Sequence, residues 1–279
     1  MSENQPNDGD KQLDYYRSEI EKTSQSTKRI AFEKFALAAL GSIPWVGGFI
    51  SAAISLKTEK GSIHQNNIQT QWLEEHQLKM KRLGDTINDI GQRFENLGEQ
   101  VDDRIQSESY LDIVRKAFRS WDKADTDEKR KYIGNLISNA AGTRLCSDDI
   151  IRLFIDWLNL FHEAHFSVIR NIYHEPGCTR YDIWISIHGE LERENSADAD
   201  LFKLLIRDLS TGGVIRQARD TTSDGKFLKK QSGSRTKRSQ SSRIMESAFE
   251  GKKPYMLTEL GKQFVHYTMT DLVPRIDSN

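Results

Sequence analysis

This sequence has few cysteines, few prolines and almost no net charge. Its 279 residues include two cysteines and five prolines, and the formal charge is −1. Cys146 and Cys178 alone give no disulfide framework, so we expect a reduced, cytoplasmic protein. The low proline content suits a mainly α-helical fold, and a charge near zero points to no particular partner for the molecule as a whole.

The short motifs of common enzyme and metal sites are also missing. No GxxxxGK[ST], GxGxxG, GxSxG or HExxH sequence occurs, so the corresponding phosphate loops, nucleophile turn and zinc helix are not indicated. His162, His165, His174 and Cys178 lie close together in the chain, but the Cys-x-x-Cys pair of a structural zinc site is absent. We therefore expect no catalytic residue, no metal and no cofactor.

An uncharged run over 35–56 interrupts a polar chain. A straight helix of this length would reach across a bilayer, but Pro44 and the glycines around it favour a break in the middle. More Lys and Arg precede the run than follow it, so a single span would leave the C-terminal part outside, whereas a hairpin keeps both ends on one side. The polar residues 1–30 are expected to form a flexible tail.

We thus predict a hydrophobic hairpin over 31–57 that contacts a membrane or an oligomer core, or that is buried in a helical bundle. Its predicted contact residues are Phe35, Leu37, Leu40, Pro44, Trp45, Phe49, Ile50 and Ile54.

The next segment, 58–108, carries a heptad pattern. Apolar residues recur in steps of three and four from Met80 to Val101, which predicts a coiled-coil-like helix. Gly84, Gly91 and Gly98 recur at one heptad position, although each glycine costs a helix roughly 0.8–1.0 kcal/mol relative to alanine. The repeat predicts close backbone packing against a second copy, giving a homo-oligomer, or against the hairpin. The alternative is a flexible, marginal helix.

A helical region over 109–159 follows, in which Thr126 is the predicted N-cap of the stretch TDEKRKYIGNLISNAAG. This stretch, the aromatic-rich helix after it and the proline- and glycine-broken apolar segment before it resemble bacterial abortive-infection proteins of the alpha type, over roughly residues 35–175. The resemblance implies a phage-defence or stress-linked, membrane-related protein. It supplies no catalytic residues.

The order of elements over 160–279 predicts a winged helix-turn-helix domain. Three helices, 160–174, 179–189 and 196–211, precede a strand in 214–220, and a returning strand in 254–258 leads to a final helix capped by Thr258. The inner face of the third helix is predicted to consist of Leu201, Leu204, Leu205 and Leu209.

Two groups of cations in this domain are candidates for binding a polyanion. Lys203 and Arg207 lie one turn apart on the third helix, but acids surround them, so a solvated face is the alternative. The predicted wing, 220–253, is basic, polar and expected to be disordered; it would contact nucleic acid, an anionic surface or an acidic protein, or be only a solvated insertion. Its cations are Lys226, Lys229, Lys230, Arg235, Lys237, Arg238 and Arg243.

These patterns predict a non-enzymatic bacterial defence or stress-linked protein, cytoplasmic or associated with the inner membrane. Its hydrophobic segment would engage a membrane or an oligomer core, and its winged-helix module would sense or dock a partner, releasing the hydrophobic segment. The alternative is a DNA-binding winged-helix regulator whose helical N-terminal half mediates oligomerisation.

Overall fold

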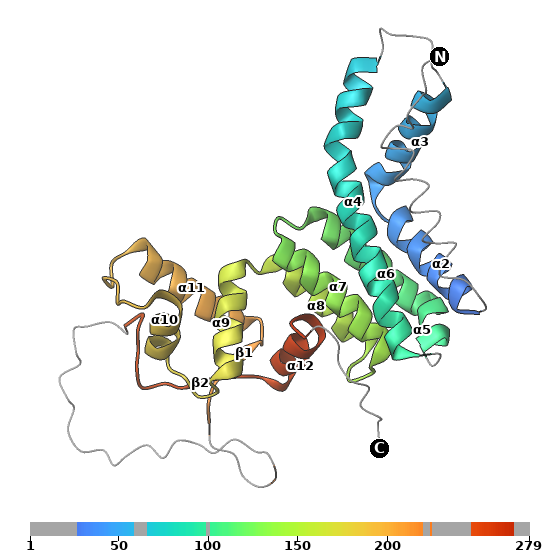
Figure 1. Ribbon diagram of the computed structural model, residues 1–279. Coiled ribbons are helices and arrows are strands. Elements are labelled where there is room, and N and C mark those ends of the chain that lie inside the picture. The colour runs from blue at the N-terminus through green and yellow to red at the C-terminus, as the bar shows by residue number, and fades with distance from the viewer. Residues whose placement is uncertain (1–26, 59–65, 99–100, 220–223, 225–246, 271–279) are drawn as a thin grey trace, which may run out of the picture. The chain divides into compact units, whose positions relative to one another are not determined.

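The computed structural model describes residues 27–58, 66–98, 101–219, 224 and 247–270. These residues are mainly helical, which confirms the predicted mainly α-helical class (Figure 1). The chain divides into two compact units: unit 1 comprises residues 1–160 and 266–279, and unit 2 comprises residues 161–265. The predicted tail, 1–30, lies outside the described residues except for its last four positions, where the first described helix begins.

Unit 1 contains only helices among its described elements. They are α2 (Thr27–Gly41), α3 (Pro44–Thr58), α4 (Asn66–Leu97), α5 (Asp102–Gln106), α6 (Glu108–Lys123), α7 (Asp127–Gly142), α8 (Asp148–Leu160) and the end of α12 (Glu259–Thr268). Helix α6 packs against α2, α7 and α8, and the long helix α4 packs against α7 and α3, as Figure 1 shows.

An aromatic cluster forms the core where α2, α4 and α6 meet. The ring of Phe35 is fully buried, 5.1 Å from the ring of Phe94 and 6.1 Å from that of Phe118, in edge-on geometries that aromatic pairs favour. Tyr110 is also fully buried, and its hydroxyl donates to the carbonyl of Ile137 at 2.8 Å. These contacts fix α2 inside unit 1.

Helix α7 combines a polar start with a buried body. The Thr126 side chain accepts from the backbone N–H of Lys129, which confirms the predicted N-cap. Two asparagines in the body are buried and bind the last turn of α12: Asn135 Nδ2 donates to the Thr268 carbonyl at 2.9 Å, and Asn139 Nδ2 to the Tyr267 carbonyl at 3.0 Å. The polar residues of the GNLISNAAG stretch therefore cap the C-terminal end of a helix.

The predicted hairpin over 31–57 is wrong in its geometry. The axes of α2 and α3 meet at 96°, so the two arms form a corner and do not return alongside one another. The break lies at Ser42 and Ile43, and Pro44 is the first residue of α3. Proline suits that position because its fixed φ is helical and its missing N–H would be unpaired there anyway.

The predicted heptad helix, 58–108, is shorter than expected. Helix α4 ends at Leu97, and Gly98 adopts a φ of +81°, a left-handed conformation that favours glycine and ends a helix. Gly98 therefore does not continue the packing edge predicted for the three glycines. The apolar seam is buried at Leu83, Ile87, Ile90 and Phe94, on the helix that packs against α7, α3 and α2 of the same chain.

Unit 2 holds α9 (Glu163–His174), α10 (Arg180–His188), α11 (Ala197–Thr211) and two antiparallel strands, β1 (Ile215–Gln217) and β2 (Tyr255–Leu257). Ile215 pairs with Leu257 and Gln217 with Tyr255. The predicted caps Thr179, Ser196 and Thr258 each accept from a backbone N–H three residues on, which confirms these three helix starts. Gly261 is required where α12 passes β1, because a Cβ there would lie 2.2 Å from the Val214 carbonyl oxygen.

The predicted inner face of α11 is partly wrong. Leu201 is 48% exposed and Leu204 38% exposed, whereas Phe202 and Ile206 are buried with Leu205 and Leu209. Phe202 packs edge-on against Trp184, with ring centroids 5.3 Å apart, and burial of this larger ring rotates the two leucines outward.

The predicted wing, 220–253, is too long at its C-terminal end. Ala248 is fully buried, and the Phe249 ring lies 4.9 Å from the ring of Trp184. Glu194 accepts from the backbone N–H of Ala248 at 2.9 Å and so fixes this segment to unit 2.

Candidate functional site

The predicted contact residues of the apolar segment separate into a buried and an open set. In α2, Phe35 is fully buried, Leu40 is half-buried and Leu37 is 70% exposed. In α3, Trp45, Phe49 and Ile50 are half-buried, whereas Pro44 is exposed and Ile54 is 56% exposed. Both arms therefore combine buried and exposed apolar residues, with Leu37 exposed on α2 and Ile54 exposed on α3.

Helix α3 is held at its beginning, and Gly47, Gly48 and Ile54 are exposed farther along it. The Trp45 indole N–H donates to Asp122 Oδ1 on α6 at 2.7 Å, and the Trp45 ring lies 5.2 Å from the ring of His76 on α4. Farther along, α3 packs against α4 and α2. A Cβ at Gly47 would meet nothing within 4 Å, and one at Gly48 only Trp72 at 3.7 Å.

No single helix of the described segments is both long and apolar enough to cross a bilayer. One bent pair, Ile30–Gly41 with Pro44–Ile54, reaches the required length and composition when its two parts are taken together.

The glycines predicted to favour close packing occupy different surroundings. A Cβ at Gly91 would lie 2.7 Å from Cε2 of Phe32, so α2 approaches α4 closely at this position. Gly84 is half-buried in α4, and Gly98 lies beyond its end.

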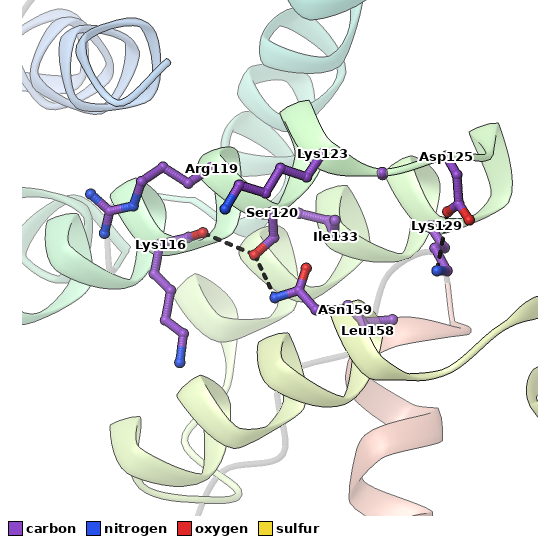
Figure 2. Close-up of a pocket in the computed structure, with 10 residues that line it drawn as sticks. Lys116, Arg119, Ser120, Lys123, Asp125, Lys129, Ile133, Leu158 and Asn159 are labelled. Carbon is purple, nitrogen blue, oxygen red and sulfur yellow. Dashed lines mark hydrogen bonds and ion pairs between the residues drawn. The ribbon is translucent and has the colours of Figure 1, made fainter. Parts of the chain in front are cut away.

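A basic cleft of about 410 Å³ lies between α6, α7 and α8 (Figure 2). Four cations and one carboxylate line it, together with a polar pair and three apolar side chains. The cations are Lys116, Arg119, Lys123 and Lys129, the carboxylate is Asp125, the polar pair is Ser120 and Asn159, and the apolar residues are Ala124, Ile133 and Leu158.

The charges in the cleft are unequally paired. Lys129 is buried and lies 3.1 Å from Asp125, and Lys116 lies 2.7 Å from Asp156. Arg119 and Lys123 are exposed and have no ion pair with any described residue. Because these two residues stand one turn apart on α6, they add uncompensated positive charge to one rim of the cleft.

The floor of the cleft is polar and ordered. The Ser120 hydroxyl donates to the Lys116 carbonyl at 3.2 Å and accepts from Asn159 Nδ2 at 2.9 Å. Figure 2 shows Ser120 on α6 facing Asn159 on α8, with both hydrogen bonds of Ser120 drawn as dashed lines. This site was not predicted from the sequence because its residues come from three helices. The spacing of Lys116, Arg119 and Lys123 on one helix is the sequence feature that could have indicated the cleft.

The predicted polyanion-binding cations of α11 are close to carboxylates. Lys203 Nζ lies 3.7 Å from Asp200 and 3.9 Å from Glu194, and Arg207 Nε lies 3.7 Å from Asp208. In each pair, the carboxylate offsets the positive charge that would attract a polyanion. The wing cations Lys226, Lys229, Lys230, Arg235, Lys237, Arg238 and Arg243 lie outside the described residues.

Burial shifts the pKa values of both cysteines and of His165 in the described residues. Burial raises the pKa of the Cys178 thiol to about 11, and it also raises the pKa of Cys146. Both thiols therefore remain protonated near neutral pH. Burial lowers the pKa of His165, whose Nδ1 accepts from the His162 N–H at 3.1 Å in a capping arrangement.

Within the described ranges, no group of three or more His, Cys, Asp or Glu side chains is arranged to hold a metal ion. The chain matches no protein-family model, no curated protein sequence and no solved structure, so its function has to be argued from its own residues.

Proposed function

We propose that this is a non-enzymatic bacterial defence or stress-linked protein that docks on a membrane through α3 and binds a protein partner through unit 2. The observation that carries the proposal is the open apolar surface of α3. The helix has no charged residue from Pro44 to Leu56, and it packs against α2 and α4, with a hydrogen bond from Trp45 to Asp122 on α6.

The distribution of apolar residues on α3 favours a bilayer over a second protein copy. Apolar and small residues occur all round this helix, whereas a helix that pairs with one partner has a single apolar stripe and a polar face. A helix with 15 residues is about 22 Å long, shorter than the hydrocarbon core of about 30 Å. We therefore propose that α3 enters one leaflet and does not span.

The buried position of α2 supports a simpler mechanism than release of the whole apolar segment. Phe35 anchors α2 in the core, and the Trp45–Asp122 hydrogen bond holds the start of α3. Helix α3 can then contact a membrane while α2 stays folded in unit 1.

Flotation of the full chain with neutral phosphatidylcholine vesicles tests this proposal. The assay uses about 1 M salt, where the Debye length is about 3 Å and surface charge contributes little. We expect the chain to float with the vesicles and Ile54→Asp to reduce the bound fraction several-fold, because a charge would enter the apolar layer. Leu160→Asp, at an exposed leucine of α8, is the matched control and should float as the parent does.

Light scattering on the same variants separates a bilayer from a second copy. The membrane proposal fails if Ile54→Asp dissociates an oligomer and leaves flotation unchanged, because α3 would then be a contact between copies of the chain.

We further propose that unit 2 is a winged-helix module that binds a protein. Three helices followed by an antiparallel strand pair and a closing helix are the elements of that fold. Exposed Leu201 and Leu204, beside the exposed acids Asp198 and Asp200, suit an apolar protein surface with basic groups better than a phosphate backbone.

The basic sequence of the wing favours DNA binding as the second candidate. A salt titration of binding to random duplex DNA decides between the two, since phosphate contacts give a steep loss of affinity with salt. Binding that is steep in salt and is lost on deletion of 226–243 would support the DNA-binding regulator. If no binding to DNA is measured, the proposal that unit 2 binds a protein stands.

A further inference from the structure

We propose that the basic cleft between α6, α7 and α8 binds a phosphate group. This proposal of a phosphate site goes beyond the membrane proposal and does not rest on it. Arg119 and Lys123 stand at one rim without carboxylate partners among the described residues, and the buried Lys129 lines the cleft as well.

The donors present match the oxygens of a phosphate. Arginine presents a planar fork that binds two oxygens at once, and lysine adds a compact charge. The one lining carboxylate, Asp125, is 3.1 Å from Lys129 Nζ and is offset by it. Asn159 uses an amide N–H to hold Ser120, so the polar floor is ordered before a ligand arrives.

The size and lining of the cleft suit a ligand larger than an inorganic phosphate ion. A volume of about 410 Å³ is within the range of sites for small organic ligands. Ile133, Leu158 and Ala124 add apolar surface beside the cations. The ligand class is therefore a phosphate monoester or diphosphate with an organic part, which exists either as a soluble metabolite or as the headgroup of an anionic lipid.

Isothermal titration of the full chain with pyrophosphate tests the site directly. We expect saturable binding of one pyrophosphate per chain, weakened at least about tenfold in Arg119→Gln/Lys123→Gln, because two charge-assisted contacts are removed. Both side chains are exposed, so the variant should keep the melting temperature of the parent. The control Lys131→Gln/Arg144→Gln removes the same charge from exposed positions that do not line the cleft, and should bind within about twofold of the parent.

A second measurement identifies the source of the phosphate. Vesicles of phosphatidylcholine with and without phosphatidic acid are compared for the parent and both double variants. Phosphatidic acid-dependent binding that Arg119→Gln/Lys123→Gln abolishes and pyrophosphate displaces would support a lipid headgroup. Variant-sensitive pyrophosphate binding with unchanged vesicle binding would support a soluble ligand.

The proposal is overturned if neither probe binds saturably, or if the control variant weakens binding as much as the cleft variant. Ile54→Asp should retain the affinity of the parent for pyrophosphate. Failure of the membrane proposal is thereby distinguishable from failure of the phosphate site.

Discussion

At the scale of single residues, the two buried asparagines of α7 show how much a polar side chain can fix. Asn139 Nδ2 donates to the Tyr267 carbonyl at 3.0 Å and to the Thr270 carbonyl at 3.2 Å. Carbonyls at a helix end have no partner within the helix, and burial without one is costly. One amide therefore satisfies two backbone groups at the end of α12.

Replacing this donor should destabilise unit 1. Asn139→Asp places a carboxylate against carbonyl oxygens in a buried site, and we expect a loss of about 1–3 kcal/mol or more in the free energy of unfolding at pH 7. Urea unfolding followed by circular dichroism measures it. Burial favours the protonated form of the new carboxyl, which can donate again, so the loss should shrink as pH falls toward 4.

Asn88→Asp is the control for this prediction, because Asn88 is exposed on α4. Its free energy of unfolding should stay within about 0.5 kcal/mol of the parent. Equal losses in the two variants would mean that added negative charge, and not the lost donor, is responsible.

At the scale of elements, the starts of the helices were predictable from the sequence. Thr126, Thr179, Ser196 and Thr258 cap helices where their side chains and the following acids indicated. Capping depends on residues within one turn of each other, so local sequence contains the information.

The buried face of each helix and the angle between neighbouring helices were less predictable from the sequence. The rotation of α11 depends on Phe202 meeting Trp184, and the 96° corner depends on how α2 and α3 each meet other helices. The basic cleft likewise needs α6, α7 and α8 together. Contacts between residues far apart in the sequence decide all three, and spacing along one chain segment does not contain them.

The division of α2 into a buried and an exposed face gives an element-scale prediction. Phe35→Ala removes a fully buried ring between Phe94 and Phe118 and should cost about 3–5 kcal/mol in the free energy of unfolding. Leu37→Ala, two residues along the same helix, should cost less than about 0.5 kcal/mol because its side chain is exposed. Urea denaturation of both variants measures this contrast, and similar costs would mean that α2 leaves the core.

At the scale of the whole molecule, the two units have separate cores and separate proposed tasks. The apolar helix α3 and the basic cleft belong to unit 1, whereas the exposed leucines of α11 belong to unit 2. A change in solution conditions that acts on one core should therefore leave the other folded. The buried histidine of unit 2 makes the core of that unit sensitive to acid.

His165 sits in the core of unit 2 as a neutral ring. It stacks on Phe161 with ring centroids 5.1 Å apart, and its Nε2 lies 3.9 Å from Asp208 Oδ2. Burial lowers its pKa, and the opposing charge of Asp208 reduces but does not reverse that effect. His162, at 6.0 Å between ring centroids, lowers it further when protonated.

Acidification should therefore weaken unit 2. Burial also lowers the pKa of His266 in unit 1, so the comparison is made within α9 and α11 of unit 2. Below the ordinary histidine pKa of about 6.5 the unfolded chain takes up a proton that the folded chain does not, so stability falls with pH by at most about 1.4 kcal/mol per unit. Hydrogen exchange of α9 and α11 amides at pH 7.5 and 5.5 measures this, with His165→Gln compared at each pH to cancel the intrinsic pH dependence of exchange. We expect protection at pH 5.5 to drop in the parent and in His174→Gln, the exposed control, and to drop less in His165→Gln. An equal drop in all three would assign the effect to another group.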